Sequence, residues 1–393
     1  MSPDFLIVGA GMAGAATAAH LSALGSTLVL EQGAAPAQEG AAQNAGLIRR
    51  LDPEPCDRAL AQRTFLFLTT IAPEWGLNSL STQTGAVLGL VRDPLRLHNA
   101  RAHLNEHGIT IQSIDPASIP VLTGSPVQHA WHLPDERICN GPAMAKAMLA
   151  KSIELGATLR CDERIIALTT DRNRVTGVQT TRGHYAAGCV ILAGGAWTRR
   201  VAQTAGIDRP LFALERTAGL ITGQLKPAPG DPWVWLDDVG IYAKPEGDHW
   251  LVSPCNERVS DVPAGPGSTG EPSPSDWSLT ERKIQTFFPS IAPVSRIRSW
   301  TGLRTFAPDR RPLIGEDNDL ANLWWASGLG GSGVSSCWGV GEAIAAWISQ
   351  RPTPWLDPAT VDPCRTQLRR WPIFPSGDPA KARLIEGVPN TLA

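Results

Sequence analysis

A glycine-rich segment near the N-terminus carries the clearest chemical signal in the sequence. Residues 9–14 read Gly-Ala-Gly-Met-Ala-Gly, so their spacing is G-x-G-x-x-G. The apolar run 5–8 precedes the segment and the alanine-rich stretch 15–24 follows it, which predicts a strand, a tight turn and a helix. In such a turn the first glycine permits the bend, the second lets the backbone approach a pyrophosphate, and the third allows close packing of the helix. The segment therefore predicts a dinucleotide at the helix N-terminus, although a tight turn without a ligand fits the same pattern.

An acidic residue follows the next predicted strand. Residues 27–30 are predicted as this strand, with Leu28 to Leu30 apolar, and Glu31 lies 20 residues beyond Gly11. A carboxylate at this position accepts hydrogen bonds from ribose hydroxyls and repels a 2′-phosphate. NAD and FAD are both compatible with this pattern, whereas NADP is disfavoured.

Two more glycine turns are predicted beside the first one. One turn, 194–195, follows the apolar run 189–193, and the other, 328–333, precedes a predicted helix over 335–348. A single extended cofactor could touch all three turns. The last helix N-terminus would stabilise the negative charge that builds up near N1 and O2 of a reduced isoalloxazine. Both turns could also serve only to pack strands against helices. The three turns together favour FAD over NAD.

The composition disfavours several other classes of protein. The chain has 393 residues, with 35 Lys and Arg against 37 Asp and Glu, so two or three domains are expected and no overall charge attracts nucleic acid. No long uncharged apolar run predicts a transmembrane segment. Seven cysteines without a C-x-x-C pair, and no export signal, predict a cytoplasmic protein, with peripheral contact at the inner membrane left open. No metal-binding or serine-hydrolase motif is present.

The order of the predicted elements gives an α/β fold with two domains. We expect a discontinuous Rossmann-like domain from residues 1–81, 138–211 and 301–350, an antiparallel β-sheet substrate domain from 82–137 and 212–300, and a C-terminal extension over 351–393. Strands of the second domain are predicted at 85–91, 130–133, 214–225, 233–235, 240–244 and 250–253. Helices are predicted at 60–68, 94–107 and 142–155, and an exposed, proline- and glycine-rich excursion at 262–275.

Five segments in a fixed order carry a resemblance to a known family: residues 7–14, 43–48, 193–197, 300–309 and 328–341. Through them the sequence, from residue 3 to about 350, resembles the D-amino-acid oxidase superfamily of flavoproteins, which includes glycine oxidase, sarcosine oxidase and bacterial D-amino-acid dehydrogenases. Residues 242–245, taken with 302–304, are most similar to the bacterial D-arginine dehydrogenase type. That type has a histidine and a tyrosine near the places of Gly46 and Leu51, so a preference for D-arginine is not implied.

The resemblance implies FAD as the cofactor, together with the residues that contact it. These are Gly9, Ala10, Gly11, Met12, Ala13, Gly14, Glu31, Gln32, Asn44, Ala45, Gly46, Leu47, Ile165, Ala193, Gly194, Gly195, Trp197, Gly330, Gly331, Ser332, Gly333 and Val334. Where the sarcosine-oxidase branch attaches its flavin through a cysteine, this chain has Gly302, which implies non-covalent FAD. That branch also brings a lysine to flavin N5, whereas the corresponding segment 251–257 has none, which favours a dehydrogenase over an oxidase.

The resemblance also implies which side chains bind the substrate. Arg304 would hold the substrate carboxylate through a bidentate pair, and Tyr242 would add a hydroxyl contact. Taken without the motif, an arginine could equally be a surface ion-pair partner, and a tyrosine could belong to the core. Weaker candidates for the substrate site are Arg49, Arg50, Arg216, Trp235 and Gly331.

The implied function is the oxidative deamination of a D-amino acid to a 2-oxo acid and ammonia, with hydride transfer from Cα to flavin N5. One alternative is an oxidase or dehydrogenase for glycine, sarcosine, an imino acid or another secondary amine. A second alternative, a non-catalytic flavin electron-transfer subunit, is disfavoured because both Arg304 and Tyr242 are present. The expected partners are a small amino acid and an electron acceptor, which could be a quinone, an electron-transfer protein or O2.

Overall fold

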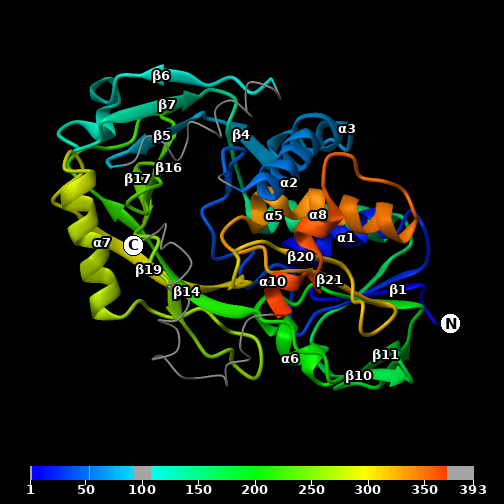
Figure 1. The fold of residues 1–393 in the computed structure, drawn as a ribbon. Helices are drawn as coiled ribbons and strands as arrows, with labels where there is room; N and C mark the ends of the chain where they lie inside the picture. The colour runs from blue at the N-terminus through cyan, green and yellow to red at the C-terminus, as the bar shows by residue number, and fades with distance from the viewer. Residues whose placement is uncertain (1, 53, 93–107, 370–393) are drawn as a thin grey trace.

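A six-stranded sheet organises one half of the protein, of which the computed structural model describes residues 2–52, 54–92 and 108–369 (Figure 1). In spatial order its strands are β20 (Leu313–Glu316), β21 (Leu323–Ser327), β13 (Cys189–Leu192), β1 (Phe5–Val8), β2 (Thr27–Leu30) and β9 (Thr158–Arg160). β20 runs antiparallel to β21, and the other neighbours are parallel. β2 and β13 are buried along their whole length, as parallel strands covered on both faces should be.

Helices cover one face of this sheet and a small second sheet covers the other. On one face lie α1 (Met12–Leu21), α2 (Pro55–Leu66), α5 (Gly141–Glu154) and α8 (Gly333–Ile348), which share a core with strand residues such as Ile7. On the other face lie α6 (Thr198–Gln203) and a three-stranded sheet of β10 (Ile165–Asp171), β11 (Arg174–Thr180) and β12 (His184–Ala186). The strand side chains alternate between these two cores because successive residues of a strand point to opposite faces.

Short elements connect these layers. A small sheet consists of β3 (Leu47–Ile48), β4 (Ser81–Gln83) and β8 (Arg137–Cys139). The short turns are the π-helical η1 (Phe67–Ile71) and the 3-10 turns η2 (Asn78–Leu80), η3 (Pro116–Ser118), η4 (Pro120–Leu122) and η5 (Gly195–Trp197). The short helices are α3 (Ala72–Glu74), α9 (Pro358–Val361) and α10 (Thr366–Arg369). Among the described helices, none has the length and apolar character needed to cross a bilayer.

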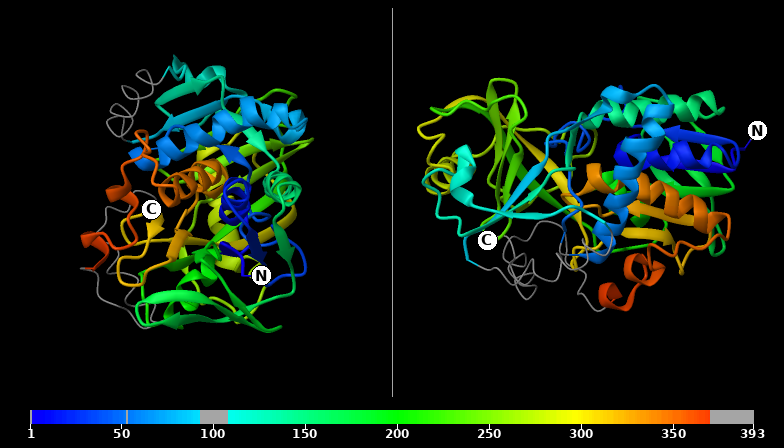
Figure 2. Two further views of the ribbon diagram at one scale, coloured as in Figure 1. Left: turned by 90° about the vertical axis from the view of Figure 1, so that its right-hand side faces the viewer. Right: turned by 90° about the horizontal axis from the view of Figure 1, so that it is seen from above.

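A nine-stranded sheet forms the other half of the protein and lies beside the first half (Figure 2). Its main path is β18 (Arg258–Val259), β14 (Phe212–Thr222), β17 (His249–Ser253), β16 (Ile241–Glu246), β15 (Trp233–Leu236), β5 (Ala86–Leu90), β7 (His129–Leu133) and β6 (Gln112–Ile114), and β19 (Ser295–Phe306) pairs with β14. Neighbours are antiparallel except β15 and β5. The two-domain α/β fold predicted from the sequence is therefore confirmed.

The large sheet has one covered outer face and one inner face toward the first half. Helix α7 (Pro274–Phe287) packs on the outer face, where Trp277 and Ile284 join a core with Trp250. The inner face contributes to a core that also contains Ala45 and Leu51 from the first half. Side chains on the inner face are thus placed between the two sheets.

Two features of the fold differ from the sequence expectations. Helix α7 was not predicted, because its buried residues Trp277, Thr280 and Ile284 form a narrow stripe on an otherwise polar helix. Its start signal was present: the Ser273 Oγ accepts a hydrogen bond from the Asp276 N–H at 3.1 Å, and Pro274 follows directly. Helix α8 begins at Gly333, two residues before its predicted start. The helix predicted at 94–107 lies outside the described residues.

A substitution in α8 tests the close packing of helices on the first sheet. A Cβ at Gly341 would lie 2.6 Å from the carbonyl carbon and oxygen of Ala16 in α1, so Gly341→Ala must separate the two helices. We expect the free energy of unfolding to fall by about 1–3 kcal/mol, the usual cost of overpacking, in urea denaturation. Gly265→Ala is the control, because a Cβ there would meet no atom within 4 Å. Equal stability of the two variants would show that the helices adjust without cost.

Candidate functional site

A pocket lies where the central parallel strands end. The ends of β1, β2, β13 and β21 contribute Val8, Leu30, Ala193 and Ala326 to its wall, and its volume is about 390 Å³. The carboxyl edge of a parallel sheet is the usual ligand site of this architecture, because the strand-to-helix turns converge there. All three glycine turns singled out in the sequence line this one pocket.

The first turn has the shape that its three glycines predict. Gly9 has φ of +100°, and a Cβ there would lie 2.6 Å from the Ala193 carbonyl oxygen, so a side chain is excluded. A Cβ at Gly14 would lie 1.9 Å from the Gly9 carbonyl oxygen, so this glycine allows α1 to pack on the turn. A Cβ at Gly11 would instead meet nothing within 4 Å. Open space therefore faces the N-terminus of α1, as a bound pyrophosphate requires.

The carboxylate of Glu31 lies in the wall of the pocket, beside the first glycine turn. Its Oε2 accepts a hydrogen bond from the Ala10 N–H and its Oε1 accepts one from the Gly33 N–H, both at 2.8 Å. Burial raises the pKa of Glu31, and these two hydrogen bonds oppose the increase because they favour the charged form. Glu31 also lines the pocket, so it is placed to meet a ribose as the sequence predicts.

The predicted cofactor residues fall into two groups. Those that line the pocket are Gly9, Gly11, Met12, Ala13, Glu31, Gln32, Asn44, Ile165, Ala193, Gly194, Gly195, Trp197, Gly330, Gly331, Gly333 and Val334. Those outside its wall are Ala10, Gly14, Ala45, Gly46, Leu47 and Ser332. Wall residues that the sequence reasoning did not single out include Gln38, Glu39, Glu163, Arg164, Arg200 and Ser268. Arg200 belongs to helix α6 and the others come from loops, and no recognisable motif marks any of them, so no local pattern could have found them.

Arg304 lies in the wall of the pocket near the end of β19. Its Nη1 donates a hydrogen bond to the Leu303 carbonyl at 3.3 Å, and its Nη2 donates one to the Gln43 carbonyl. Among the described residues no carboxylate pairs with this guanidinium. Burial lowers the pKa of Arg304 to about 10, and Tyr242 acts in the opposite direction. The group is therefore a partly buried cation that remains charged at neutral pH.

Tyr242 lies on β16, opposite Trp235 of β15, and does not belong to the pocket wall. The two rings stack with their centroids 5.2 Å apart, and the Arg49 guanidinium lies 4.4 Å from the centroid of Trp235. Burial raises the pKa of Tyr242 to about 12, so its phenol is a hydrogen-bond donor at neutral pH. Arg49 also forms an ion pair with Asp52 and lies 3.5 Å from the Ser332 Oγ. This stack lies between the inner face of the large sheet and the start of α8.

The other two arginine candidates differ in position. Arg216 of β14 pairs with Glu257 and lies next to the third glycine turn, because its Nη1 is 3.6 Å from where a Cβ of Gly331 would be. Arg50 forms a buried ion pair with Glu136 at 3.0 Å and is not part of the pocket wall. Burial raises the pKa of Glu136 to about 7, although Arg50 opposes the increase. Arg216 thus lies beside the pocket at Gly331, whereas Arg50 links its own loop to the loop of Glu136, outside the pocket wall.

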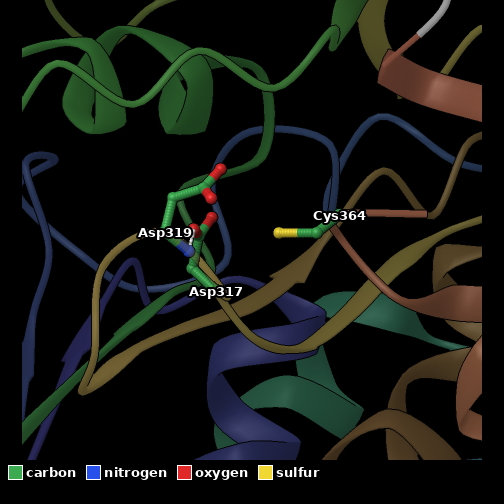
Figure 3. Close-up of side chains that lie close together, drawn as sticks. All are labelled: Asp317, Asp319 and Cys364. Atoms are coloured by element: carbon green, nitrogen blue, oxygen red, sulfur yellow. Dashed lines mark hydrogen bonds between the residues drawn. The ribbon is translucent and has the colours of Figure 1, made fainter. Parts of the chain in front are cut away.

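A separate group, Asp317, Asp319 and Cys364, offers oxygen and sulfur atoms at metal-binding distances (Figure 3). Arg209 already binds both carboxylates, at 2.5 Å from Asp317 and 2.8 Å from Asp319. The indole N–H of Trp325 also donates to Asp317, at 2.9 Å. These donors satisfy the carboxylates, so we assign this cluster a structural role next to the end of β20.

Comparison with known proteins places the chain in a family. The sequence profile of the DAO family, described as FAD dependent oxidoreductase, matches residues 4–347. The chain belongs to this family. The resemblance identified from the sequence is thereby confirmed, and the family implies FAD as the cofactor. The open cradle at Gly11 and the carboxylate of Glu31 fit a dinucleotide.

Several curated proteins and solved structures are similar to this DAO-family chain. It is 28% identical over 377 residues to 4-methylaminobutanoate oxidase (formaldehyde-forming) of Paenarthrobacter nicotinovorans, covering 91% of this chain but 45% of that protein. It is 24% identical to mitochondrial sarcosine dehydrogenase of Mus musculus, covering 88% of this chain and 39% of that protein. It is 26% identical to glycine oxidase of Pseudomonas aeruginosa, covering 92% and 99%. The chain thus spans less than half the length of the first two relatives.

The solved structures show the same fold. L-proline dehydrogenase from P. horikoshii superimposes with a TM-score of 0.81 at 21% identity, covering 93% of this chain and 98% of that one. Glycine oxidase from Geobacillus kaustophilus superimposes with a TM-score of 0.78 at 19% identity, covering 94% and 99%.

The cradle at Gly11 predicts a substitution that separates folding from FAD binding. The Cβ of Gly11→Ala would enter open space, so we expect the stability of the FAD-free protein to change by less than about 1 kcal/mol. The same methyl group would occupy the space that the pyrophosphate needs, so we expect the Kd for FAD to rise at least tenfold. Titration of FAD-free protein by flavin fluorescence measures this Kd, with Gly265→Ala as the control. An unchanged Kd would place the pyrophosphate elsewhere.

Proposed function

We propose that this DAO-family protein oxidises the C–N bond of an amino acid whose carboxylate is held by Arg304, with FAD as the oxidant. A D-amino acid is the first candidate, with oxidative deamination to a 2-oxo acid and ammonia. An amino acid with a secondary amine is the second candidate. The observation that carries the proposal is the unpaired charge of Arg304 in the wall of the pocket.

Arg304 differs in its charge environment from the other arginines near the site. Arg49 has Asp52 as its partner, and Arg216 has Glu257. A buried charge without a counter-ion is costly, so a site that keeps one is suited to a ligand that brings the opposite charge. A carboxylate is the natural ligand, because a guanidinium can donate two parallel hydrogen bonds to it.

Tyr242 can support this carboxylate site from the neighbouring strands. Tyr242 and Arg304 are close enough to influence each other's pKa, and the raised pKa keeps the phenol protonated. A protonated phenol donates a hydrogen bond without adding a negative charge. Tyr242 therefore favours the same anionic ligand as Arg304.

FAD would be held by the three glycine turns and Glu31, and when bound it supplies the two-electron oxidant that accepts a hydride from the substrate. Gly302 supports non-covalent binding: a Cβ there would lie 2.4 Å from the Gln43 Oε1 and 2.7 Å from the Gln43 Cβ. A side chain long enough to form a covalent bond has no room in this arrangement. We expect the cofactor to be released when the protein is unfolded by acid.

The reaction needs a substrate amine with a free electron pair. Loss of a hydride from Cα of the neutral amine, with donation of the nitrogen electron pair, gives a protonated imine, and water then converts it to the 2-oxo acid and ammonium. Arg304 and Tyr242 orient the carboxylate, so that Cα is presented in one direction. No protein base is required if the amine enters neutral, so turnover should decrease below the pKa of the bound amine.

The secondary-amine candidate is supported by the names of the relatives. Two of the similar proteins are named for 4-methylaminobutanoate and sarcosine, which both carry an N-methyl amine. The same hydride step applies to them. When the N-methyl carbon is oxidised, water releases it as an aldehyde and leaves the primary amine; when Cα is oxidised, water releases the 2-oxo acid and the alkylamine. For the electron acceptor, the absence of lysine from residues 251–257 favours a partner other than O2.

Replacing Arg304 tests the carboxylate site. Loss of a hydrogen-bonded charge pair costs about 2–5 kcal/mol, so Arg304→Ala should lower kcat/KM by about 30- to 5,000-fold while FAD remains bound. Anaerobic flavin bleaching near 450 nm, with D- and L-amino acids, glycine, sarcosine and proline, measures the reductive step. Arg304→Lys should recover part of the loss, because it restores the charge without the bidentate geometry.

Arg298→Ala provides the matched control. Arg298 lies on the same strand, is exposed, and packs over the Trp300 ring at 5.1 Å from its centroid. Its loss should leave the rate of bleaching within a factor of two or three. A yellow protein that no member of the panel bleaches would refute the proposal, and equal rates in Arg304→Ala and the unmodified protein would refute the role of Arg304.

A further inference from the structure

Residues 262–269, the strap, form an irregular segment that runs along the cofactor pocket. The chain enters the strap from β18 and leaves it toward helix α7, so the strap belongs to the half of the protein that contains the large sheet. Two of its residues, Ala264 and Ser268, nevertheless form part of the pocket wall. No backbone hydrogen bond joins one strap residue to another. Contacts with other parts of the protein therefore hold the strap in place.

One set of contacts comes from the residues that follow β13. The indole N–H of Trp197 donates a hydrogen bond to the Pro263 carbonyl at 2.8 Å. Arg200 of α6 donates through Nη1 to the same carbonyl at 2.7 Å and through Nη2 to the Val262 carbonyl at 2.5 Å. Three hydrogen bonds from the first half thus bind the beginning of the strap.

The second set of contacts comes from the loop that follows β2. The Oε1 of Glu39 accepts a hydrogen bond from the Gly267 N–H at 2.6 Å. Its Oε2 accepts one from the Ser268 N–H at 3.0 Å and another from the Ser268 hydroxyl. The Nε2 of Gln43 donates to the Thr269 hydroxyl. Hydrogen bonds to a carboxylate are stronger than those between neutral groups, so Glu39 is the main attachment of this end.

The strap joins parts of the pocket wall that come from different strands. β2 and β13, which precede the two sets of contacts, lie on either side of β1 in the sheet. Arg164, just before β10, adds a hydrogen bond to the Ala264 carbonyl at 3.0 Å. Glu39, Arg164 and Arg200 all line the pocket themselves. Polar side chains of the wall thus hold the strap against the pocket.

These attachments are of a kind that can be released. The side chains of Arg164 and Arg200 are exposed, and no strap residue belongs to one of the hydrophobic cores. A segment that is held by exposed hydrogen bonds and buries little apolar surface opens at a small fraction of the free energy of global unfolding. The strap can therefore open while the two halves of the protein stay folded.

We propose that the strap closes over bound FAD, and that release of its hydrogen bonds to Glu39 and Arg200 opens the pocket for cofactor exchange. Non-covalent FAD, supported above by the crowding at Gly302, needs such a device to be retained. The strap slows exchange in both directions, because the pocket is accessible to the cofactor only while the strap is released. This inference concerns cofactor retention and does not depend on the identity of the substrate.

The rates of FAD association with FAD-free protein and of FAD dissociation, both followed by stopped-flow flavin fluorescence, test the strap. In Glu39→Gln and in Arg200→Met the strap should be open for a larger fraction of the time. We expect each rate to rise at least threefold in both variants. A side chain that only contacts FAD would give a different result, because loss of a contact acts mainly on the dissociation rate.

The two variants change the charge at the pocket in opposite directions. FAD is anionic, so electrostatics alone would make association faster in Glu39→Gln and slower in Arg200→Met. Faster association in Arg200→Met therefore cannot be an effect of charge. For Glu39→Gln, comparison at low and high salt removes the electrostatic part, because salt screens exposed charges.

Arg182→Met is the matched control for the loss of a positive charge. Arg182 is exposed, lies in the turn between β11 and β12 of the same half, and is outside the pocket wall. Both rates should stay unchanged in this variant.

The proposal requires faster association in both strap variants. Slower or unchanged association in either of them refutes it, and a rise in dissociation alone identifies the two side chains as cofactor contacts instead. Equal changes in Arg182→Met and Arg200→Met would assign the effect to charge and also overturn the proposal.

Discussion

The pairing of β14 with β19 is the constraint on which the active site depends. Each residue from Phe212 to Thr222 has a partner on β19, so the ladder runs from the outer end of the large sheet to the cofactor pocket. Arg304 lies near the pocket end, opposite Leu214, and Arg216 lies opposite Gly302. Because side chains alternate along a strand, a slip of β19 by one residue would turn Arg304 to the face opposite that of Arg216. The long ladder makes such a slip costly.

Close packing of glycines sets the other side of the same site. Gly9 touches the backbone at Ala193, and Gly341 brings α8 against α1, so the three glycine turns meet at one edge of the parallel sheet. The N-terminus of α8 then faces the large sheet at Gly331, beside Arg216. The glycine turns of the first half and Arg216 and Arg304 of the large sheet thus come together at this edge.

The parts of this arrangement that could be predicted from sequence are those with a local pattern. The turn at 9–14, Glu31 and the apolar strands follow from residue spacing, and the position of Arg304 followed from a motif of neighbouring residues. The polar wall residues Glu39 and Arg164 come from loops, and their approach to the pocket depends on the whole fold. Helix α7 escaped prediction because it buries only a narrow stripe, even though its capping serine and proline were visible.

Ion pairing explains why arginines of similar appearance in the sequence have different roles. Arg49 and Arg50 are neighbours, yet Arg49 packs on Trp235 near the site while Arg50 is bound by Glu136 away from it. Sequence spacing could not separate them, since the deciding partners lie far along the chain.

The role of each arginine depends on whether a carboxylate of the protein pairs with its guanidinium. A paired arginine is satisfied by the fold, whereas an unpaired one is satisfied only by a ligand. By this criterion we propose Arg304 as the ligand-binding residue, and Arg216 is intermediate, since it shares its acid with Arg310 and keeps one donor unused. Burial lowers the pKa of Arg304 only to about 10, so its charge persists across the neutral range. This guanidinium therefore stays charged at low pH, so the proposed decrease of turnover there would come from protonation of the substrate amine.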